Sequence, residues 1–302
     1  MIQAIKELGE QKLRREGRDI SDIFSIIVED SDKDGKTPKV LVAVFKKKGS
    51  KVLYDHTRIE DNSKEKISKY LYRRRASQGP DYTPTAKITE VKKMFRNKIE
   101  RWFKQYKGSD ELINSLKSVI EKSKAEISED LSEKLRNISP SLKRNQGCLF
   151  TLAIEENGKL KYLGDFPAFK NLLIDSVKKD YQKIVKADHI CSVCGKVKDE
   201  VYGDALPFPF YTLDKPGYIA GGFYKKDAWK NAPVCLECVL KIEEGRKFME
   251  SNLKSTMGGQ KYYLIPKFIL GVEGIEEIID TFFYNIEHRE DVLSQKALKN
   301  IT

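Results

Sequence analysis

The sequence predicts an α+β protein, in which antiparallel hairpins and amphipathic helices accompany an insertion held by a zinc site of four cysteines. Three observations lead to this prediction. Short runs rich in β-branched residues are bounded by turn signals, longer segments carry apolar residues at helical spacing, and two C-x-x-C pairs enclose a loop-rich segment. The chain has 302 residues, which is enough for one large domain or two ordinary ones.

The N-terminal part predicts one hairpin and several helices. Residues 3–16 have the pattern of a helix. The segments DIFSIIVED and KVLVAVFKKK are rich in β-branched residues and flank a turn-forming stretch, so we expect them to pair as antiparallel strands. Further helices are expected at residues 88–106, where apolar side chains recur at helical spacing, and at residues 109–137.

A second hairpin and three more helices are expected in the remainder. The segment CLFTLAIEENGKLKYLG predicts two strands joined by Asn157-Gly158, a residue pair typical of hairpin turns. Helices are expected at residues 167–186, 236–253 and 272–287, and a strand at residues 261–270. We therefore expect a basic α+β N-terminal domain at residues 1–165. A zinc-containing α+β region follows at residues 166–302, with the zinc insertion at about 188–246.

The charge of the chain favours a polyanionic partner. Lys and Arg number 56 and Asp and Glu 45, a net charge of +11. Residues 64–107 hold fourteen basic and four acidic residues, so most of the excess lies in this stretch. The N-terminus lacks the apolar region of a signal peptide, and no apolar stretch approaches the ~20 residues that cross a bilayer. We therefore expect a cytoplasmic protein without a membrane partner.

Four of the five cysteines are predicted to bind one zinc ion. Cys191 and Cys194 form one C-x-x-C pair, and Cys235 and Cys238 form the other. Zn²⁺ prefers four N or S ligands in a tetrahedral arrangement, and each C-x-x-C turn supplies two thiolates. Because sulfur would fill all four positions, no position remains for water or substrate, and the expected role of the zinc is structural. The fifth cysteine, Cys148, is expected to be a buried core thiol.

The chain between the two cysteine pairs is rich in proline, glycine and aromatic residues and has few long periodic segments. Such a segment builds little core by itself. A metal that binds both of its ends would stabilise it by closing the loop and through the metal–ligand bonds.

The order of these features is similar to that of a known family. The segments ICSVCGK, FPFYTLDKPGYIAGGF, AWKNAPVCLECVLKIEEGRKFM and YYLIPKFIL resemble the Csh-type large subunit of the type I-B CRISPR Cascade effector complex. The resemblance covers about residues 191–270, and its most specific parts are FYTLDKPG and the C-L-E-C helix start. It implies a non-catalytic subunit of an RNA-guided surveillance complex. Such a subunit binds target DNA, helps to recognise the protospacer-adjacent motif and supports formation of the R-loop.

The resemblance also implies partners. These are double-stranded target DNA, the crRNA-bearing Cascade backbone and the handle-capping subunits, with the separate helicase-nuclease as a further candidate. Members of this family are generally longer and end in a helical domain, so we expect the chain to correspond to the N-terminal portion of such a subunit.

Nucleic-acid contacts are predicted on three basic segments. Arg73, Arg74 and Arg75 lie before a Gly-Pro break, where guanidinium groups could meet phosphates or a base edge. On the helix that follows, a turn of about 100° per residue places five cations within an arc of about 120°. These are Lys92, Lys93, Arg96, Lys104 and Lys107. Between the cysteine pairs, Lys225 and Lys226 lie among aromatic residues that could stack on bases.

Two other classes of function stay open. A metal-dependent nuclease would need clustered carboxylates or a histidine beside a nucleophile. The one plausible pair is His56 with Asp55, which a surface turn explains as well. A protein-assembly module without direct DNA contact would use its charge to face RNA-bound neighbours, and salt-dependent DNA binding would separate it from a DNA-binding subunit. His189, two residues before Cys191, is an alternative zinc ligand.

Overall fold

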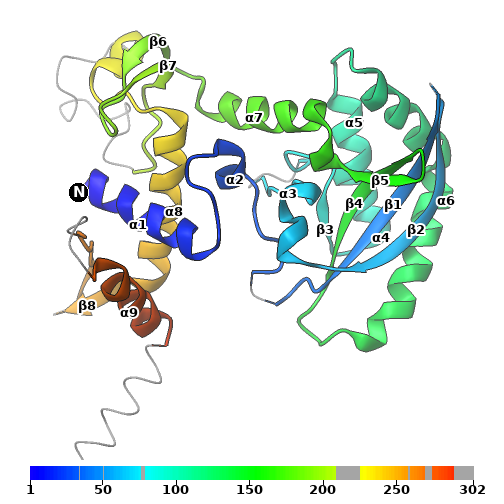
Figure 1. Ribbon diagram of the computed structural model, residues 1–302, viewed down its shortest axis with the longest axis horizontal. Helices are drawn as coiled ribbons and strands as arrows, with labels where there is room; N and C mark the ends of the chain where they lie inside the picture. Colours follow the sequence, from blue (N-terminus) through cyan, green and yellow to red (C-terminus); the bar gives the residue numbers. More distant parts are fainter. Residues whose placement is uncertain are drawn as a thin grey trace, which may run out of the picture. The chain divides into compact units, whose positions relative to one another are not determined.

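The computed structural model of the protein describes residues 1–33, 35–49, 51–75, 79–208, 225–257, 259–268 and 274–288. Helices and antiparallel hairpins occur together (Figure 1), which confirms the α+β class. The chain divides into two compact units. Residues 27–178 form the first, called the sheet unit here. Residues 1–26 and the described residues from Lys179 onward form the second, called the cysteine unit.

The sheet unit is built on a five-stranded sheet with the order β2-β1-β4-β3, in which β5 also pairs with β4. The strand β1 is antiparallel to β2 but parallel to β4, whereas β3 and β5 are antiparallel to β4. The two central strands are buried over most of their length, as their continuous apolar runs favour. The strands are β1 Lys39–Lys48, β2 Lys51–Asp61, β3 Ala86–Ile88, β4 Cys148–Glu156 and β5 Lys159–Tyr162.

One predicted hairpin is confirmed and the other is wrong. Between β4 and β5, Asn157 and Gly158 have φ angles of 53° and 72°, as the expected turn requires. The segment DIFSIIVED, predicted as a strand, instead contains the helix α2 Ile23–Ile27. Asp22 caps this turn, because its carboxylate accepts hydrogen bonds from the backbone N–H groups of Phe24 and Ser25. The strand β1 therefore pairs with β2 and β4 rather than with residues 22–30.

The helix predicted at residues 109–137 is confirmed as α6 Glu111–Ile138. The helix predicted at residues 167–186 is confirmed only as far as α7 Pro167–Tyr181, and the strand β6 Val185–Ile190 begins where the helix was expected to continue. Helix α6 packs along β2, and Asp110 caps it by accepting a hydrogen bond from Ile113 N at 3.0 Å. Shorter helical segments complete the region. They are η1 Lys64–Lys66, α3 Ile67–Tyr70, η3 Ser139–Ser141 and η4 Leu163–Asp165.

The helix expected at residues 88–106 changes its geometry along its length. It begins as α4 Val91–Met94, continues as a π-helical segment η2 Phe95–Glu100 and ends as α5 Arg101–Gln105. Its buried side chains pack toward the sheet and α6. A π-helix forms i→i+5 hydrogen bonds and therefore has more residues per turn than an α-helix. The uniform turn of 100° per residue assumed from the sequence does not hold here.

The cysteine unit contains the first helix of the chain together with the C-terminal elements. Helix α1 Ile2–Arg15 packs against α8 Leu236–Asn252 (Figure 1), and both confirm helices expected from the sequence. The helix expected at residues 272–287 is confirmed as α9 Ile275–Glu287. The strand expected at residues 261–270 is shorter and ends at Tyr263, and residues 269–270 and 272–273 of these two predictions lie outside the described residues. The other elements are β6 Val185–Ile190, β7 Val197–Tyr202, η6 Lys225–Lys230, β8 Lys254–Met257 and β9 Gln260–Tyr263.

Ion pairs accompany the packing of α1 on α8. Lys241, which is buried, lies 3.0 Å from Glu10, and Lys12 pairs with Glu244. These contacts place residues 2–15 in the cysteine unit, although the sequence grouped them with residues 1–165.

Candidate metal centre and basic surfaces

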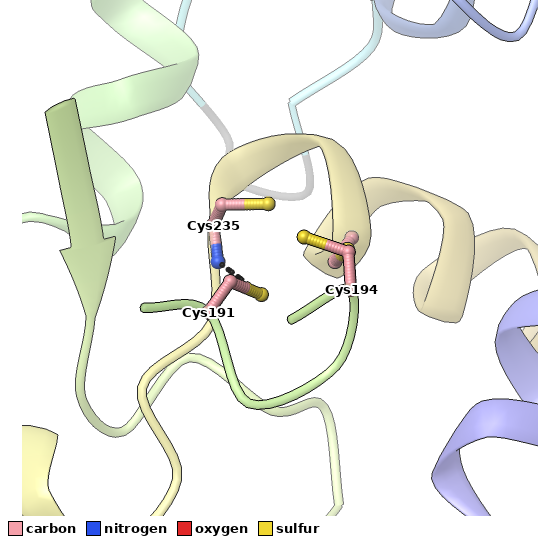
Figure 2. Close-up of side chains that lie close together, drawn as sticks. Cys191, Cys194 and Cys235 are labelled. Carbon is pink, nitrogen blue, oxygen red and sulfur yellow. Dashed lines mark hydrogen bonds between the residues drawn. The ribbon is translucent and has the colours of Figure 1, made fainter. Parts of the chain in front are cut away.

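The four cysteines predicted as zinc ligands come together between the β6–β7 hairpin and the start of α8. Their Sγ atoms all lie within 4.8 Å of one another. Cys191 and Cys194 lie on the turn between β6 and β7, Cys235 is the N-cap residue of α8, and Cys238 lies in its first turn. Figure 2 shows the labelled sulfur atoms turned toward a common centre. Zn–S bonds of about 2.3 Å in a tetrahedron give S–S separations of about 3.8 Å, so the cluster has the size of a zinc site with four thiolate ligands.

Backbone hydrogen bonds fix the positions of these cysteines. Gly195 N donates to Cys191 O at 2.9 Å, with a φ of 69° at Gly195 that glycine adopts without strain. Cys191 N donates to Lys196 O, also at 2.9 Å. The two C-x-x-C turns meet where Cys235 N donates to Cys191 Sγ at 3.3 Å (Figure 2). An N–H donor favours the thiolate form of the sulfur that it contacts.

Hydrogen bonds among the thiols shift their pKa values in opposite directions. Hydrogen bonding with Cys235, and then with Cys238, lowers the pKa of Cys191. Hydrogen bonding with Cys191 raises the pKa of Cys235 to about 12, and it raises the pKa of Cys238 as well. Thiolates this close together repel one another, so deprotonation of one thiol opposes deprotonation of its neighbours. Four thiolates need the positive charge of a metal, and the four side chains could bind an ion such as zinc.

The alternative ligand His189 and the fifth cysteine, which was expected to be a core thiol, both lie outside this cluster. Cys148 is buried in β4, where burial raises the pKa of its thiol to about 11. His189 packs its ring against the indole of Trp229, with ring centroids 4.7 Å apart. In the described part of the chain, the four clustered cysteines are the one group of three or more side chains placed to share a metal ion.

The structure gives the three neighbouring arginines different environments. Arg73 is buried, its Nη1 donates to Ile27 O at 2.8 Å, and its guanidinium lies 5.4 Å from the centre of the Tyr82 ring. Arg75 is half-buried and lies over the same ring at 4.3 Å. Arg74 is exposed. The environment of Arg73 is that of a structural residue, whereas Arg74 and part of Arg75 face solvent.

The five cations predicted on one arc separate into different positions. Lys92 and Arg96 line a groove of about 960 Å³ that α6 closes on its other side. Lys93 is exposed outside the lining of this groove. Lys104 lies 3.5 Å from Glu100. The π-helical segment accounts for part of the separation, because it changes the angular position of every residue that follows Met94. Lys107 is exposed beyond the end of α5.

Helix α6 adds two cations that the sequence reasoning missed. Lys124 and Arg136 line the same groove, together with Ser128 and Ser132. These four residues follow an i, i+4 spacing that places them on one helix face, and this spacing is the signal that could have identified them. The groove also has apolar and acidic lining residues: Val91, Phe95, Leu135, Glu90, Glu100 and Glu129.

The loop cations are only partly described. Lys226 is exposed in the turn η6, whereas the side chain of Lys225 and residues 209–224 lie outside the described residues. The same turn carries Trp229, which packs on β6.

The pair His56 and Asp55 lies on β2. Its Nδ1 and Oδ2 atoms are 2.7 Å apart, the histidine side chain is 51% exposed, and Lys46 lies 2.9 Å from Asp55. Hydrogen bonds from Lys46 and then from His56 lower the pKa of Asp55. The groove residues do not include this pair. None of the described helices has the length and apolarity needed to cross a membrane.

Two family models match the chain over most of its length. The N-terminal domain of CRISPR-associated protein TM1802 matches residues 1–175, which include the basic helix 91–105. The central domain of the same family matches residues 188–301, which include the four clustered cysteines. No curated protein and no solved structure matches the chain. The two domain matches follow one another in the order of a single family, and the chain belongs to the TM1802 family of CRISPR-associated proteins.

Proposed function

We propose that this protein is the non-catalytic large subunit of an RNA-guided CRISPR surveillance complex of the Csh type (type I-B). In that role it binds target DNA, helps to recognise the protospacer-adjacent motif and supports R-loop formation. Membership of a CRISPR-associated family supports a role in CRISPR defence. The resemblance of residues 191–270 to the Csh-type large subunit supports type I-B. One zinc ion at the four cysteines would be structural, because sulfur would occupy every ligand position.

The observation that carries the DNA-binding part is a set of exposed cations without acidic partners. Lys92, Lys93 and Arg96 are all exposed, and no ion pair of the described residues involves them. By contrast, Lys66 and Lys98 from the same basic stretch neutralise Glu60 and Asp81. Unpaired cations on a rigid helix are available to neutralise phosphates and release counterions.

The acidic residues of the groove limit where DNA would lie. Glu90, Glu100 and Glu129 line the groove together with the cations, and these carboxylates would repel a polyanion that entered it. We therefore expect the phosphates to contact Lys93 outside the groove together with Lys92 and Arg96 of its lining, without entering the groove between the carboxylates.

Binding of duplex DNA by the purified chain tests this proposal. The variant Lys93→Glu/Arg96→Glu is expected to bind all duplex sequences more weakly. The slope of log K against log salt should become shallower by about 0.9 for each lost phosphate contact. Lys122→Glu, at an exposed position on α6 that does not line the groove, is the control for a single charge reversal, to be compared with Lys93→Glu alone. Equal binding by the wild type and the double variant would contradict the proposed surface and favour the assembly module.

A further inference from the structure

A second surface, in the cysteine unit, combines an indole ring with two lysines. The turn η6 brings Trp229 against β6, where Nζ of Lys186 lies 5.2 Å from the centre of the indole. Nζ of Lys230 lies 5.7 Å from the same centre. The ring of His189 approaches at 4.7 Å with an interplanar angle of 66°. Two segments that are distant in the sequence therefore meet at one aromatic side chain.

Backbone packing fixes the position of Trp229. Gly203, at the end of β7, has no side chain, and a Cβ there would overlap the backbone nitrogen of Trp229. Ala228 is buried next to it, and Asn231 N donates to Ala228 O at 3.1 Å. Val234, which directly precedes Cys235, exchanges two backbone hydrogen bonds with Tyr202. The indole is thus supported by the same segment that leads into the candidate metal centre.

The surroundings of the indole face solvent. Five of the six residues of β6 are exposed, among them Lys186, for which the described residues offer no ion-pair partner. Lys230 is 58% exposed and lies 3.0 Å from Asp227, which is itself 48% exposed. A solvent-exposed ion pair contributes little stability, so a phosphate can take the place of Asp227 at low cost. The two ammonium groups are therefore free to bind an anion beside the ring.

We propose that this surface binds a single strand of nucleic acid, with one base stacked on Trp229 and the adjacent phosphates at Lys186 and Lys230. A single strand presents base faces that a duplex keeps stacked inside, and aromatic side chains bordered by cations are suited to it. The arriving base displaces a lysine ammonium from the face of the indole to a neighbouring phosphate, where the ammonium forms a charge-assisted hydrogen bond. The proposal does not depend on duplex binding at helix 91–105, because the residues belong to the other unit.

Tryptophan fluorescence can report on this surface directly. The chain has two tryptophans, and the other one, Trp102, donates from Nε1 to Tyr82 O at 3.0 Å in the sheet unit. In a Trp102→Phe background, oligothymidylate or oligouridylate is expected to quench the fluorescence of Trp229. The oligonucleotide that binds with the higher affinity shows whether the surface prefers DNA or RNA. A duplex of equal length and polyglutamate should have little effect. If polyglutamate displaces the oligonucleotide as effectively as unlabelled oligonucleotide does, the surface binds an acidic protein partner instead of nucleic acid.

Substitutions then assign the contacts, with binding measured by the anisotropy of a labelled oligonucleotide, because the Trp229 variants lose the fluorescent reporter. Trp229→Leu is expected to weaken single-strand binding roughly 10- to 100-fold, whereas Trp229→Phe keeps part of the stacking. Lys186→Gln and Lys230→Gln should each make the salt slope shallower by about 0.7. Lys261→Gln, exposed on β9, is the matched control. Lys93→Glu/Arg96→Glu should leave this binding unchanged, which separates it from the duplex surface.

Two results would overturn the proposal. The first is an absence of quenching by both oligonucleotides. The second is unchanged binding by Lys186→Gln and Lys230→Gln. Both lysines are exposed, so the Lys186→Gln and Lys230→Gln variants should fold. They therefore test single-strand binding even if Trp229→Leu unfolds the region.

Discussion

Gly9 and Gly245 face each other where α1 packs against α8. A Cβ on Gly9 would overlap the carbonyl oxygen of Lys241, and a Cβ on Gly245 would overlap that of Ile5. The two helix backbones are therefore in direct contact. Because α8 begins at two of the clustered cysteines, this contact connects the N-terminal helix to the candidate metal centre.

Gly9→Ala is expected to lower the free energy of unfolding of the cysteine unit by about 1–3 kcal/mol, because the helices must move apart. Alanine favours a helix over glycine by up to about 1 kcal/mol, so a loss of stability must come from the overlap. Denaturant unfolding measures the change. Gly147→Ala is the control, since a Cβ there would lie 3.7 Å from Ile88 O, an ordinary contact. Stability equal to wild type in Gly9→Ala would show that the helices do not pack in this way.

Elemental analysis is expected to find about one zinc ion per chain. Chelation should increase hydrogen exchange first in β6, β7 and the start of α8, and then in α1, which packs on α8. Amides of β1 and β4, in the other unit, serve as the internal reference. Cys191→Ser should lose the metal and Cys148→Ser should keep it. Near-zero zinc in protein purified without chelator would contradict the four-cysteine zinc site.

The Glu244 carboxylate should make the stability of the cysteine unit depend on pH. Burial alone would raise its pKa, but the ammonium groups of Lys12 and Lys247 outweigh burial and lower the pKa to about 2. A depressed pKa stabilises the folded state above the unfolded pKa of about 4.3. That contribution is lost as the pH falls toward about 2. The stability advantage of the wild type over Glu244→Gln should therefore shrink across this window. A constant difference from pH 7 to pH 2 would show that the ion pairs contribute nothing.

Arg73 and Arg74 are neighbours for which we expect opposite effects. Arg73→Ala removes the partner of Ile27 O and should cost about 1–3 kcal/mol of stability. Arg74→Ala should leave stability unchanged and weaken DNA binding by the assembled complex. If Arg74 reads a base edge, its loss erases the preference for the flanking motif, by about 1–3 kcal/mol. If it contacts phosphate, all sequences lose affinity equally. Denaturant unfolding and DNA-binding curves measure both effects. Unchanged stability in Arg73→Ala, or a loss of stability in Arg74→Ala, would contradict the assignment.

The features that could be predicted from the sequence carry strong local signals. The Asn157-Gly158 turn, the amphipathic helices and the two C-x-x-C pairs each depend on residues close together in the chain. The cysteine cluster was predictable because the chemistry of four thiolates requires them to meet, although two of them lie more than forty residues from the other two.

The features that were missed depend on distant partners or on small energetic differences. The parallel pairing of β1 with β4 joins residues such as Val42 and Thr151, and no local pattern encodes it. Asp22 caps the helix α2, a local signal for a helix start that competes with the β-branched composition of the segment. The i, i+4 spacing of Lys124 and Arg136 with two serines marks one face of α6, but the sequence does not say that this face lies beside the basic helix.

Purification of the protein from its native host, followed by sequencing of bound RNA and a cleavage assay, separates a subunit of a surveillance complex from a protein with another role. We expect crRNA and other CRISPR subunits in the same particle, and no cleavage of DNA or RNA by the purified chain with magnesium or manganese. Recovery without guide RNA or CRISPR partners would contradict the assignment to a surveillance complex. Cleavage that disappears in His56→Ala would contradict a non-catalytic role.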